Sequence, residues 1–499
     1  MSDKILWQPT NVENTQLYQL MKEQGFSTYH DIYDWSVTHP TAFWEKIWHD
    51  NDIIHSVGYT QVVDDIKQMP GAKWFEGARL NFAENLLRYR DNNNAIIFKK
   101  ENTLLQYYTR QELYDAVAKI AQQLRDWGVK PGDRVAGIVA NIPETVIAML
   151  ATVAIGGIWS SCSPDFGVEG IVSRFDQITP KILVSINGYY YKGNYVDVSE
   201  KAIAVMGQVS SIENVIVIPY GENQTDYFHE NVQLMTSLLS AADVPELVFE
   251  QLPFDHPIYI LYSSGTTGLT KGVMLSHFNL VSNVKQLMSL SGGVSMAEDD
   301  VILVHLPLFH IYGMNVLMNP CIAAGATQVM MRRFDMEELL SIIEKHRITK
   351  LCTVPPVGLG LSQYHGLASR DLSSLKFAMF GAAPLSSKLQ VKISEVLNCP
   401  VIQGYGMTEL SPVTNIDFTE PNLLKAGSIG PALADTEEKI VDTEDPTKEL
   451  KPGEIGELVV RGPQVMKGYL NNPEATEETI TSDGWFHTGD IGKMDEEGY

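Results

Sequence analysis

The chain is poor in cysteine and in positive charge. Among its 499 residues only four are cysteines (Cys162, Cys321, Cys352 and Cys399), and no two stand at CxxC spacing. This argues against a zinc site or a disulfide framework, so we expect buried, reduced thiols in a cytoplasmic protein. Lys and Arg total 37 against 61 Asp and Glu, which gives a formal net charge of −24. Because such a chain repels polyanions, nucleic acid is disfavoured as a partner, and any phosphate must be held by a local site.

Long apolar runs are also missing. The longest covers residues 146–159 and contains Gly156 and Gly157, whereas a helix that spans a bilayer needs about 20 apolar residues. We interpret this run as a buried helix. The first four residues lack the basic and apolar segments of a signal peptide, so no integral membrane segment is expected. No GxGxxG opens a helix after the early strands, which disfavours a dehydrogenase.

Apolar strand patterns alternate with helical patterns from about Ala95 onward. The helix expected over 109–129 has Thr109 as its cap, and a second helix is expected over 335–348. Alternation of this kind indicates an α/β fold with layered, mostly parallel sheets. Strands are expected over 94–100, 133–140, 181–186, 214–219, 300–309, 350–355 and 376–385.

Changes in composition predict four parts of the chain. Residues 1–90 form a helical N-terminal extension rich in aromatic side chains, and 91–426 form the α/β core. Residues 427–490 form a small β-rich subdomain, because a strand–turn–strand pattern covers 437–462 with Pro452-Gly453 as its turn. Residues 491–499 are predicted to start a hinge.

The stretch LYSSGTTGLTKG, residues 261–272, follows an apolar run and predicts a phosphate-binding loop. Glycines let backbone N–H groups approach an anion, and hydroxyls and one cation add charge-assisted hydrogen bonds. The spacing differs from a Walker A loop, because Thr270 rather than glycine precedes the lysine. The candidate groups are Gly265, Gly268 and Gly272, then Ser263, Ser264, Thr266 and Thr267, and finally Lys271.

Four stretches in this order resemble the adenylate-forming (AMP-binding) superfamily of acyl-CoA synthetases, luciferases and peptide-synthetase adenylation domains. They are YSSGTTGLTKG, FGAAP (380–384), QGYGMTEL (403–410) and DGWFHTGD (483–490). The resemblance implies an enzyme that joins a carboxylic acid to AMP from ATP, releases pyrophosphate, and transfers the acyl group to coenzyme A.

The two halves of the chain resemble different branches of that superfamily. YDWSVTHPTAFWEKIW, MPGAKWFEGARLNFAENLL and GGIWSSCSPDFGVEGI resemble acetoacetyl-CoA and acetyl-CoA synthetases. HLPLFHIYGM and GYGMTEL are more similar to fatty-acyl and aryl-CoA ligases. Acetyl enzymes carry a Trp where Gly406 stands, so we interpret this glycine as leaving room for a longer acid. The acid therefore remains open between a short β-keto acid and a longer fatty or aryl acid.

The resemblance also implies a role for each motif residue. Thr266, Thr267 and Lys271 would hold the β- and γ-phosphates, with Ser263, Ser264, Gly265 and Gly268 completing the loop. Thr408 would contact the α-phosphate, and Glu409 would bind Mg²⁺, which prefers oxygen ligands. Asp490 would bind the ribose, while Tyr405 stacks on adenine beside Gly381, Ala382, Ala383 and Gly406. His310 would lie near the acyl carboxylate, with Gly313, Val316 and Val357 as candidates for the acyl pocket.

Two parts of the family pattern are expected beyond Tyr499, namely a ribose-binding arginine and a lysine in a mobile C-terminal domain. We therefore expect the sequence to be a fragment of a longer enzyme. Two alternatives stay open at this point, a ligase that loads a carrier protein and a non-catalytic nucleotide-binding paralogue. The oligomeric state is also open.

Overall fold

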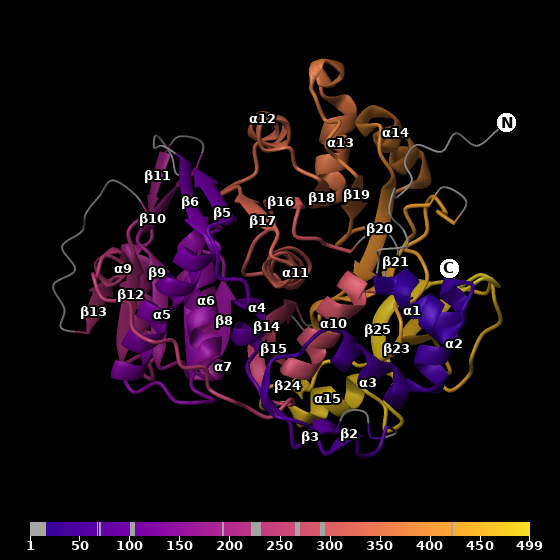
Figure 1. The fold of residues 1–499 in the computed structure, drawn as a ribbon, viewed down its shortest axis with the longest axis horizontal. Helices are drawn as coiled ribbons and strands as arrows, with labels where there is room; N and C mark the ends of the chain where they lie inside the picture. Colours follow the sequence, from indigo (N-terminus) through magenta and orange to yellow (C-terminus); the bar gives the residue numbers. More distant parts are fainter. Residues whose placement is uncertain are drawn as a thin grey trace.

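The computed structural model describes residues 16–66, 68, 71–99, 105–191, 194–220, 231–264, 270–289, 295–420 and 423–499 (Figure 1). The predicted loop residues Gly265, Thr266, Thr267 and Gly268 lie outside the described residues, and for Ser264 only the backbone is described.

The N-terminal extension consists of helices and short strand pairs around an aromatic cluster. A capping box between Thr28 and Asp31 starts the second helix. Phe43, Trp44 and Trp48 lie on one buried face of the third helix and form part of a separate core cluster. The elements are α1 (Gln16–Gln24), α2 (Tyr29–Thr38), α3 (Pro40–Asp50), β1 (His55–Val57), β2 (Gln61–Val63), β3 (Trp74–Glu76) and β4 (Arg79–Leu80).

The first large sheet has, within the described residues, the strand order β13-β12-β9-β7-β8-β14-β15-β24. The six strands from β13 to β14 are parallel, whereas β15 and β24 are antiparallel additions at one edge. β8 and β9 are buried along their whole length because helices cover both faces of the sheet. The strands are β7 (Arg134–Ile138), β8 (Ile158–Cys162), β9 (Ile182–Ile186), β12 (Asn214–Ile218), β13 (Val232–Leu234), β14 (Pro257–Ser264), β15 (Thr270–Ser276) and β24 (Gly468–Tyr469).

Helices from the first half of the chain pack on this sheet. Thr109 caps the longest of them through a capping box with Glu112, which confirms the cap predicted from the sequence. These helices are α4 (Phe82–Leu86), α5 (Arg110–Asp126), α6 (Pro143–Ala154), α7 (Val168–Ile178), α8 (Ser199–Gln208) and α9 (Met235–Leu239), with the hairpin β10 (Gly188–Tyr191) and β11 (Asn194–Asp197) beside them.

The second large sheet has the order β21-β20-β19-β18-β16-β17-β5-β6 over the described ranges, with a parallel centre and antiparallel edge strands. Its strands are β5 (Asn94–Lys99), β6 (Leu105–Thr109), β16 (Val301–Val304), β17 (Thr327–Met330), β18 (Lys350–Thr353), β19 (Phe377–Phe380), β20 (Val401–Gly406) and β21 (Val413–Ile416). Its helices are α10 (His277–Ser289), the π-helix η2 (Tyr312–Met318), α11 (Asn319–Ala324), α12 (Met336–His346), α13 (Pro355–Gln363), η3 (Leu367–Ser369), α14 (Ser387–Leu397) and η4 (Thr408–Leu410).

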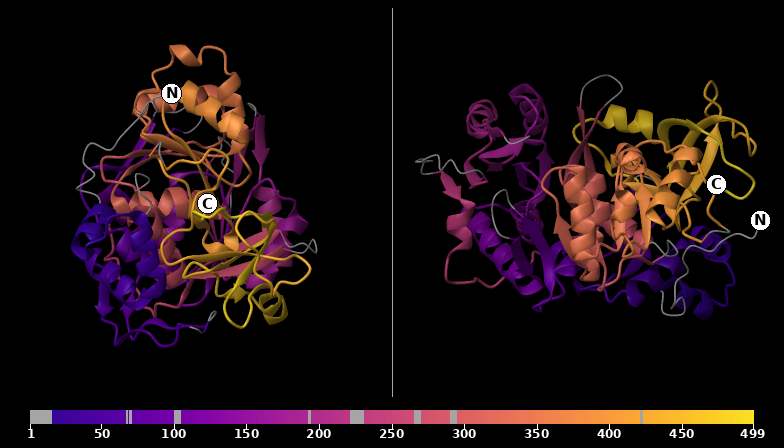
Figure 2. Two further views of the ribbon diagram at one scale, coloured as in Figure 1. Left: turned by 90° about the vertical axis from the view of Figure 1, so that its right-hand side faces the viewer. Right: turned by 90° about the horizontal axis from the view of Figure 1, so that it is seen from above.

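A small antiparallel sheet near the C-terminal end lies beside the N-terminal extension (Figures 1 and 2). Tyr29 and Tyr33 of α2 donate hydrogen bonds to the carbonyls of Ala432 and Thr436, just before this sheet. The two ends of the described chain therefore pack against each other. The elements are β22 (Glu437–Val441), β23 (Gly456–Arg461), β25 (Phe486–Gly492) and α15 (Pro473–Thr479).

The α/β fold with parallel sheet centres confirms the class predicted from the sequence. One prediction needs correction, because the apolar run 146–159 is not a single helix. Helix α6 ends at Ala154, the chain turns at Gly156, where φ is +81°, and strand β8 begins at Ile158. The four-part division of the chain stays a prediction.

All four cysteines are free and buried, as expected from their number and spacing. Within the described ranges, no helix has the length and apolar character needed to cross a bilayer.

Candidate active site

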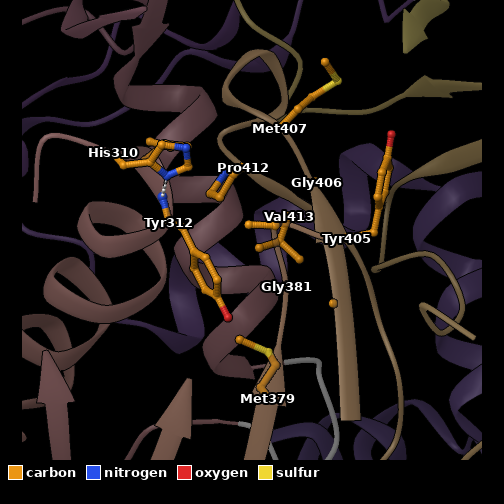
Figure 3. Close-up of a pocket in the computed structure, with 12 residues that line it drawn as sticks. His310, Tyr312, Met379, Gly381, Tyr405, Gly406, Met407, Pro412 and Val413 are labelled. Carbon is orange, nitrogen blue, oxygen red and sulfur yellow. Dashed lines mark hydrogen bonds between the residues drawn. The ribbon is translucent and has the colours of Figure 1, made fainter. Parts of the chain in front are cut away.

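The segments that follow β16 and β19 meet the end of β20 and the start of β21 at one edge of the second sheet and enclose a pocket (Figure 3). Open α/β sheets bind ligands at this edge. The pocket holds about 400 Å³ of empty space. Its lining consists of His310, Ile311, Tyr312, Met379, Gly381, Ala382, Gly404, Tyr405, Gly406, Met407, Pro412 and Val413.

His310 stands at the mouth of this pocket, on the segment that joins β16 to η2. The backbone N–H of Tyr312 donates to His310 Nδ1 at 3.2 Å. In the neutral ring the proton is therefore on Nε2, which can donate to an anionic oxygen. Desolvation by the surrounding protein lowers the pKa of the imidazole. The Nε2–H of His310 can therefore donate to a carboxylate, which is the position predicted for this residue from the sequence.

The turn after β19 forms a second wall of the pocket. The N–H of Gly381 donates to Thr353 at 3.1 Å, and Ala382 has a φ of +66°, which is uncommon for a residue with a side chain. A Cβ built on Gly381 would lie 3.3 Å from the Tyr312 ring. Gly381 and Ala382 therefore line the pocket, whereas Ala383 follows them outside the lining residues.

Tyr405 and Asp490 are brought together from different sheets. The Tyr405 hydroxyl donates to Asp490 Oδ2 at 2.6 Å, although the residues lie on β20 and β25. Burial, followed by the hydrogen bond to Asp490, raises the pKa of Tyr405 well above its usual value. The predicted adenine platform and the predicted ribose carboxylate are thus neighbours, as parts of one nucleoside would require.

Glycine is needed at position 406 because another part of the backbone lies too close for a side chain, and not because the acid is large. A Cβ at this position would lie 1.8 Å from the carbonyl oxygen of Pro412, on the neighbouring strand connection. Any side chain is therefore impossible without moving that backbone. The interpretation that this glycine leaves room for a longer acid is not what the geometry indicates, because the missing side chain would point into protein.

The predicted phosphate loop joins two strands of a hairpin. Ser263 pairs with Lys271, and Ser264 pairs with Thr270, so the described backbone brings both ends of the loop together. Nζ of Lys271 lies 4.6 Å from the ring centroid of Tyr469 on β24. The loop is thus anchored in the first sheet, whereas the pocket belongs to the second.

Glu409 lies in η4 directly after the β20 motif and is only 3 % exposed. Its Oε1 accepts a hydrogen bond from the Tyr469 hydroxyl at 3.0 Å. Its Oε2 has no hydrogen-bond partner in the described part of the chain. A buried carboxylate oxygen without a partner fits a magnesium ligand, since Mg²⁺ prefers oxygen donors and completes its shell with water and phosphate. Thr408, half-buried, precedes it at the start of η4.

No group of three or more His, Cys, Asp or Glu side chains suited to a metal ion occurs among the described residues. Glu409 would therefore be a single protein ligand, which is the usual arrangement when substrate phosphates supply further oxygens.

Sequence reasoning missed Tyr469, Tyr312 and Met379. Tyr469 lies some 200 positions after the loop it contacts, and only the pairing of β24 with β15 reveals it. Two other predictions also need correction. Gly313 and Val316 are buried in η2 and are not among the pocket's lining residues.

A larger hollow lies beside the pocket and holds about 1190 Å³ of empty space. Residues 305–307 and Phe309 line it, directly before His310 of the first pocket, so one segment forms a wall of both. Arg332 and Arg333 stand at its edge, and Val357, predicted for the acyl pocket, lines this hollow instead.

The sequence matches two known family patterns. The pattern described as AMP-binding enzyme covers residues 82–470, well over half of the chain. The pattern described as acetyl-coenzyme A synthetase N-terminus covers residues 29–86, which are the helices and short strands of the extension.

Curated relatives and solved structures agree with these matches. A 4-coumarate–CoA ligase of Humulus lupulus is 35 % identical over 382 residues, 76 % of this chain and 67 % of the relative. One of Narcissus pseudonarcissus is 34 % identical over 410 residues, 80 % of this chain and 72 % of the relative. The acetoacetyl-CoA synthetase structure from Streptomyces lividans has a TM-score of 0.89 at 28 % identity and covers 99 % of this chain and 79 % of its own. ATP-bound MatB from Rhodopseudomonas palustris has a TM-score of 0.72 at 28 % identity, covering 84 % and 77 %.

Proposed function

Because the chain belongs to the AMP-binding enzymes and is an ATP-dependent acyl-CoA synthetase, we propose that its substrate is a monocarboxylic acid of modest length with no charge besides the reacting carboxylate. The carboxylate attacks the α-phosphorus of ATP to give an acyl-adenylate and pyrophosphate, and the thiol of coenzyme A then displaces AMP to give a thioester. The observation that carries the choice of acid is the lining of the pocket at the ends of β16 and β20.

The pocket has no compensating charge for a second carboxylate. Among the described residues that line it there is no Lys, Arg, Asp or Glu. A dicarboxylic acid would bury an unpaired charge, which costs several kcal/mol. Tyr312 and Met379 lie at the inner end of the pocket (Figure 3). We therefore expect the far end of the acid to contact these two side chains. The 4-coumarate and acetoacetate in the names of similar proteins are monocarboxylic acids of this kind.

The residues of the site would contribute mainly alignment and charge neutralisation, because phosphoryl chemistry of this type needs no protein nucleophile. His310 Nε2 would donate to the carboxylate or to the α-phosphate. Thr408 would contact the α-phosphate, Lys271 the outer phosphates, and Glu409 would hold the magnesium ion. Bound Mg²⁺ supplies charge neutralisation on the phosphate oxygens.

Tyr405 and Asp490 would bind adenine and ribose as one unit. Their direct hydrogen bond of 2.6 Å fixes the ring beside the carboxylate. The Gly381–Ala383 turn and Gly406 would approach the edge of the base on the Tyr405 side of the pocket, so that His310, Tyr312 and Met379 would be left to contact the acid. The loop residues Ser263, Ser264, Gly265, Thr266, Thr267 and Gly268 would surround the outer phosphates.

The larger hollow would admit coenzyme A. Its lining residues 305–307 and Phe309 directly precede His310 of the acid pocket in the chain, so a thiol bound there would lie on the same segment as His310. Arg333 lies 3.7 Å from Asp165 and 5.5 Å from the Tyr189 ring centroid at the edge of this hollow. Arginine suits the phosphates of the cofactor because its planar guanidinium donates in pairs.

A cytoplasmic location belongs to the same proposal. Four free, buried cysteines suit a reducing compartment. Nucleic acid remains disfavoured as a partner by the net charge of −24.

The test is a panel of acids measured for thioester formation by mass spectrometry, with ATP, Mg²⁺ and coenzyme A. We expect hexanoate and 4-coumarate to react and succinate and malonate to fail by at least about 100-fold, given the cost of burying a charge. Binding of non-hydrolysable acyl-adenylate analogues by calorimetry separates recognition from turnover. Preference for a dicarboxylic acid would contradict the proposal.

A further inference from the structure

We propose that Tyr469 is a positioning residue that keeps Glu409 and Lys271 apart, each free to bind its own partner on the nucleotide. The inference rests on the roles proposed above for these two residues. Tyr469 lies on β24, outside the four motifs that the sequence singles out.

The hydroxyl end of Tyr469 fixes the carboxylate. It donates to Glu409 Oε1 at 3.0 Å, and the backbone N–H of Met466 donates to the Glu409 carbonyl at 2.7 Å. Both the side chain and the backbone of Glu409 are therefore held by the segment 466–469. The other carboxylate oxygen, Oε2, is the atom without a partner among the described residues, and so it is the one available to a cation.

The ring of Tyr469 holds the lysine. Nζ of Lys271 lies 4.6 Å from the ring centroid, within the range of a cation–π interaction. The backbones are coupled as well, since Val273 pairs with Tyr469, and the N–H of Leu470 donates to Gly272 at 2.7 Å. One rigid side chain thus contacts the cation with its ring and the carboxylate with its hydroxyl.

This placement matters because Lys271 and Glu409 have opposite charges. If they met directly, the ion pair would occupy both the lysine needed for phosphate and the carboxylate needed for Mg²⁺. Tyr469 contacts both and carries no charge. A tyrosine phenol is protonated at neutral pH, so the hydroxyl is a donor to the carboxylate.

The fold fixes Tyr469 itself. The side chain is 7 % exposed, and its backbone N–H donates to Thr476 Oγ1 at 2.9 Å. The preceding Gly468 has a φ of +139°, and a Cβ there would lie 3.1 Å from Thr476. The tyrosine is therefore held from behind by α15 while its ring and hydroxyl face the two charged groups.

The first experiment is Tyr469→Phe, which keeps the ring and removes the hydroxyl. We expect ATP to bind about 10-fold more weakly in the presence of Mg²⁺, since losing a partner of a metal ligand commonly costs 10- to 100-fold. ATP binding in EDTA should be unchanged. Calorimetry measures both affinities, and Mn²⁺ binding followed by electron paramagnetic resonance gives a readout independent of activity. Tyr469→Leu should also weaken ATP binding in EDTA, because Lys271 loses the ring.

A matched control is Tyr364→Phe, which removes an exposed tyrosine–carboxylate hydrogen bond to Glu337, and neither residue lines the pocket. It should leave both affinities unchanged. The double variant Tyr469→Phe/Glu409→Gln tests whether Tyr469 acts through Glu409. If it does, removing the tyrosine hydroxyl should have no further effect on ATP affinity once that carboxylate is gone.

The outcomes are distinguishable. If Mg²⁺ strengthens ATP binding in Tyr469→Phe as much as in the wild-type protein, but no longer does so in Glu409→Gln, the role of Glu409 stands and only this inference is overturned. If Mg²⁺ changes the ATP affinity of neither the wild-type protein nor Glu409→Gln, Glu409 does not hold the metal ion. That result would overturn both the role of Glu409 and this inference. A purely structural role for Tyr469 predicts a lower melting temperature with unchanged Mg²⁺ dependence, which would also overturn it.

Discussion

Tyr312 lines the pocket in which we propose that the acid binds. The side chain is 8 % exposed, and its hydroxyl donates to the Thr353 carbonyl at 3.2 Å. We expect Tyr312→Ala to favour acids two methylenes longer by about 10-fold, because each buried CH₂ contributes ~0.8 kcal/mol. Calorimetric Kd values for acyl-adenylate analogues of increasing length measure this shift. The cavity should also lower stability by about 3 kcal/mol.

The control for that change is Tyr312→Phe, which keeps the ring and removes one hydrogen bond. Its order of preference among the analogues should match that of the wild-type protein. If Tyr312→Ala leaves the order unchanged too, the acid does not end at this side chain.

His310 should act in its neutral form. Desolvation lowers its pKa below the ordinary value of 6.5, and the Tyr312 N–H bond to Nδ1 would be lost on protonation. We expect activity on the acid to be flat near pH 7 and to fall only below the ordinary histidine range. Replacing His310 with Ala should lower kcat/KM for the acid by about 10- to 100-fold, in line with the loss of one catalytic donor. A pH–rate profile of both proteins checks this, and an unchanged kcat/KM would count against a role in acid binding.

The motif residues could be predicted from sequence because each belongs to a short continuous pattern. Tyr405, Glu409 and His310 fall at the pocket or next to the hairpin. Tyr312 and Tyr469 could not be singled out, since their importance depends on contacts with distant segments. Gly406 shows a second limit, because only the backbone of Pro412 explains why a side chain is impossible there.

At the scale of elements, the N-terminal helices are joined to the small sheet by buried polar contacts. Trp44 of α3 donates through Nε1 to Asp435 Oδ2 at 2.5 Å, and the N–H of Asp435 donates to Ser36 Oγ at 2.7 Å. Burial, with a further contribution from the charge of Glu437, raises the pKa of Asp435 to about 8. Arg461 lowers it in part, but the carboxyl remains protonated in the folded state at neutral pH.

This shift makes stability depend on pH. In the unfolded chain Asp435 titrates at its ordinary value of 3.8, so between that pH and about 8 the folded state binds more protons. The contribution of Asp435 to stability must therefore fall as pH rises through this window. We expect Asp435→Asn to match the wild-type protein near pH 4 and to exceed it by about 1–2 kcal/mol at pH 8, because no charge is buried. Urea unfolding at several pH values measures this difference.

The control for this change is Asp299→Asn at an exposed position, which should be nearly neutral at every pH. A constant difference between Asp435→Asn and the wild-type protein across the pH range would show that Asp435 does not titrate in the window.

Helices and strands with a regular spacing of apolar residues could be predicted from the sequence. Elements whose position depends on pairing with distant segments could not. Strand β5 and helix α5 follow their apolar spacing and cap. The interpretation of residues 146–159 as one helix was wrong. Both α6 and β8 are buried on all sides, and the apolar pattern of a fully buried helix does not differ from that of a fully buried strand. The hairpin β14–β15 and its partner β24 depend on pairing between distant residues, which no local pattern encodes.

At the scale of the whole molecule, the nucleotide would contact both large sheets and the small three-stranded sheet. Lys271 comes from the first, Tyr405 from the second and Asp490 from the small one. A ligand that binds only the folded protein stabilises it by about 2.7 kcal/mol at 100 times its Kd. We expect ATP with Mg²⁺ to raise the melting temperature by at least about 3 °C, following the usual relation between stability and Tm. Differential scanning fluorimetry with ATP, GTP and EDTA checks this, and flat curves across all nucleotides would contradict the site.

The position of β24 also bears on how the protein matures during synthesis. Its partner β15 leaves the ribosome nearly 200 residues earlier, and until Tyr469 emerges that strand lacks its outer neighbour. Pairings over such long separations form late, because the intervening chain must be closed into a loop. A nascent chain therefore cannot complete the first large sheet, or form the contacts of Tyr469 with Lys271 and Glu409, until β24 has emerged.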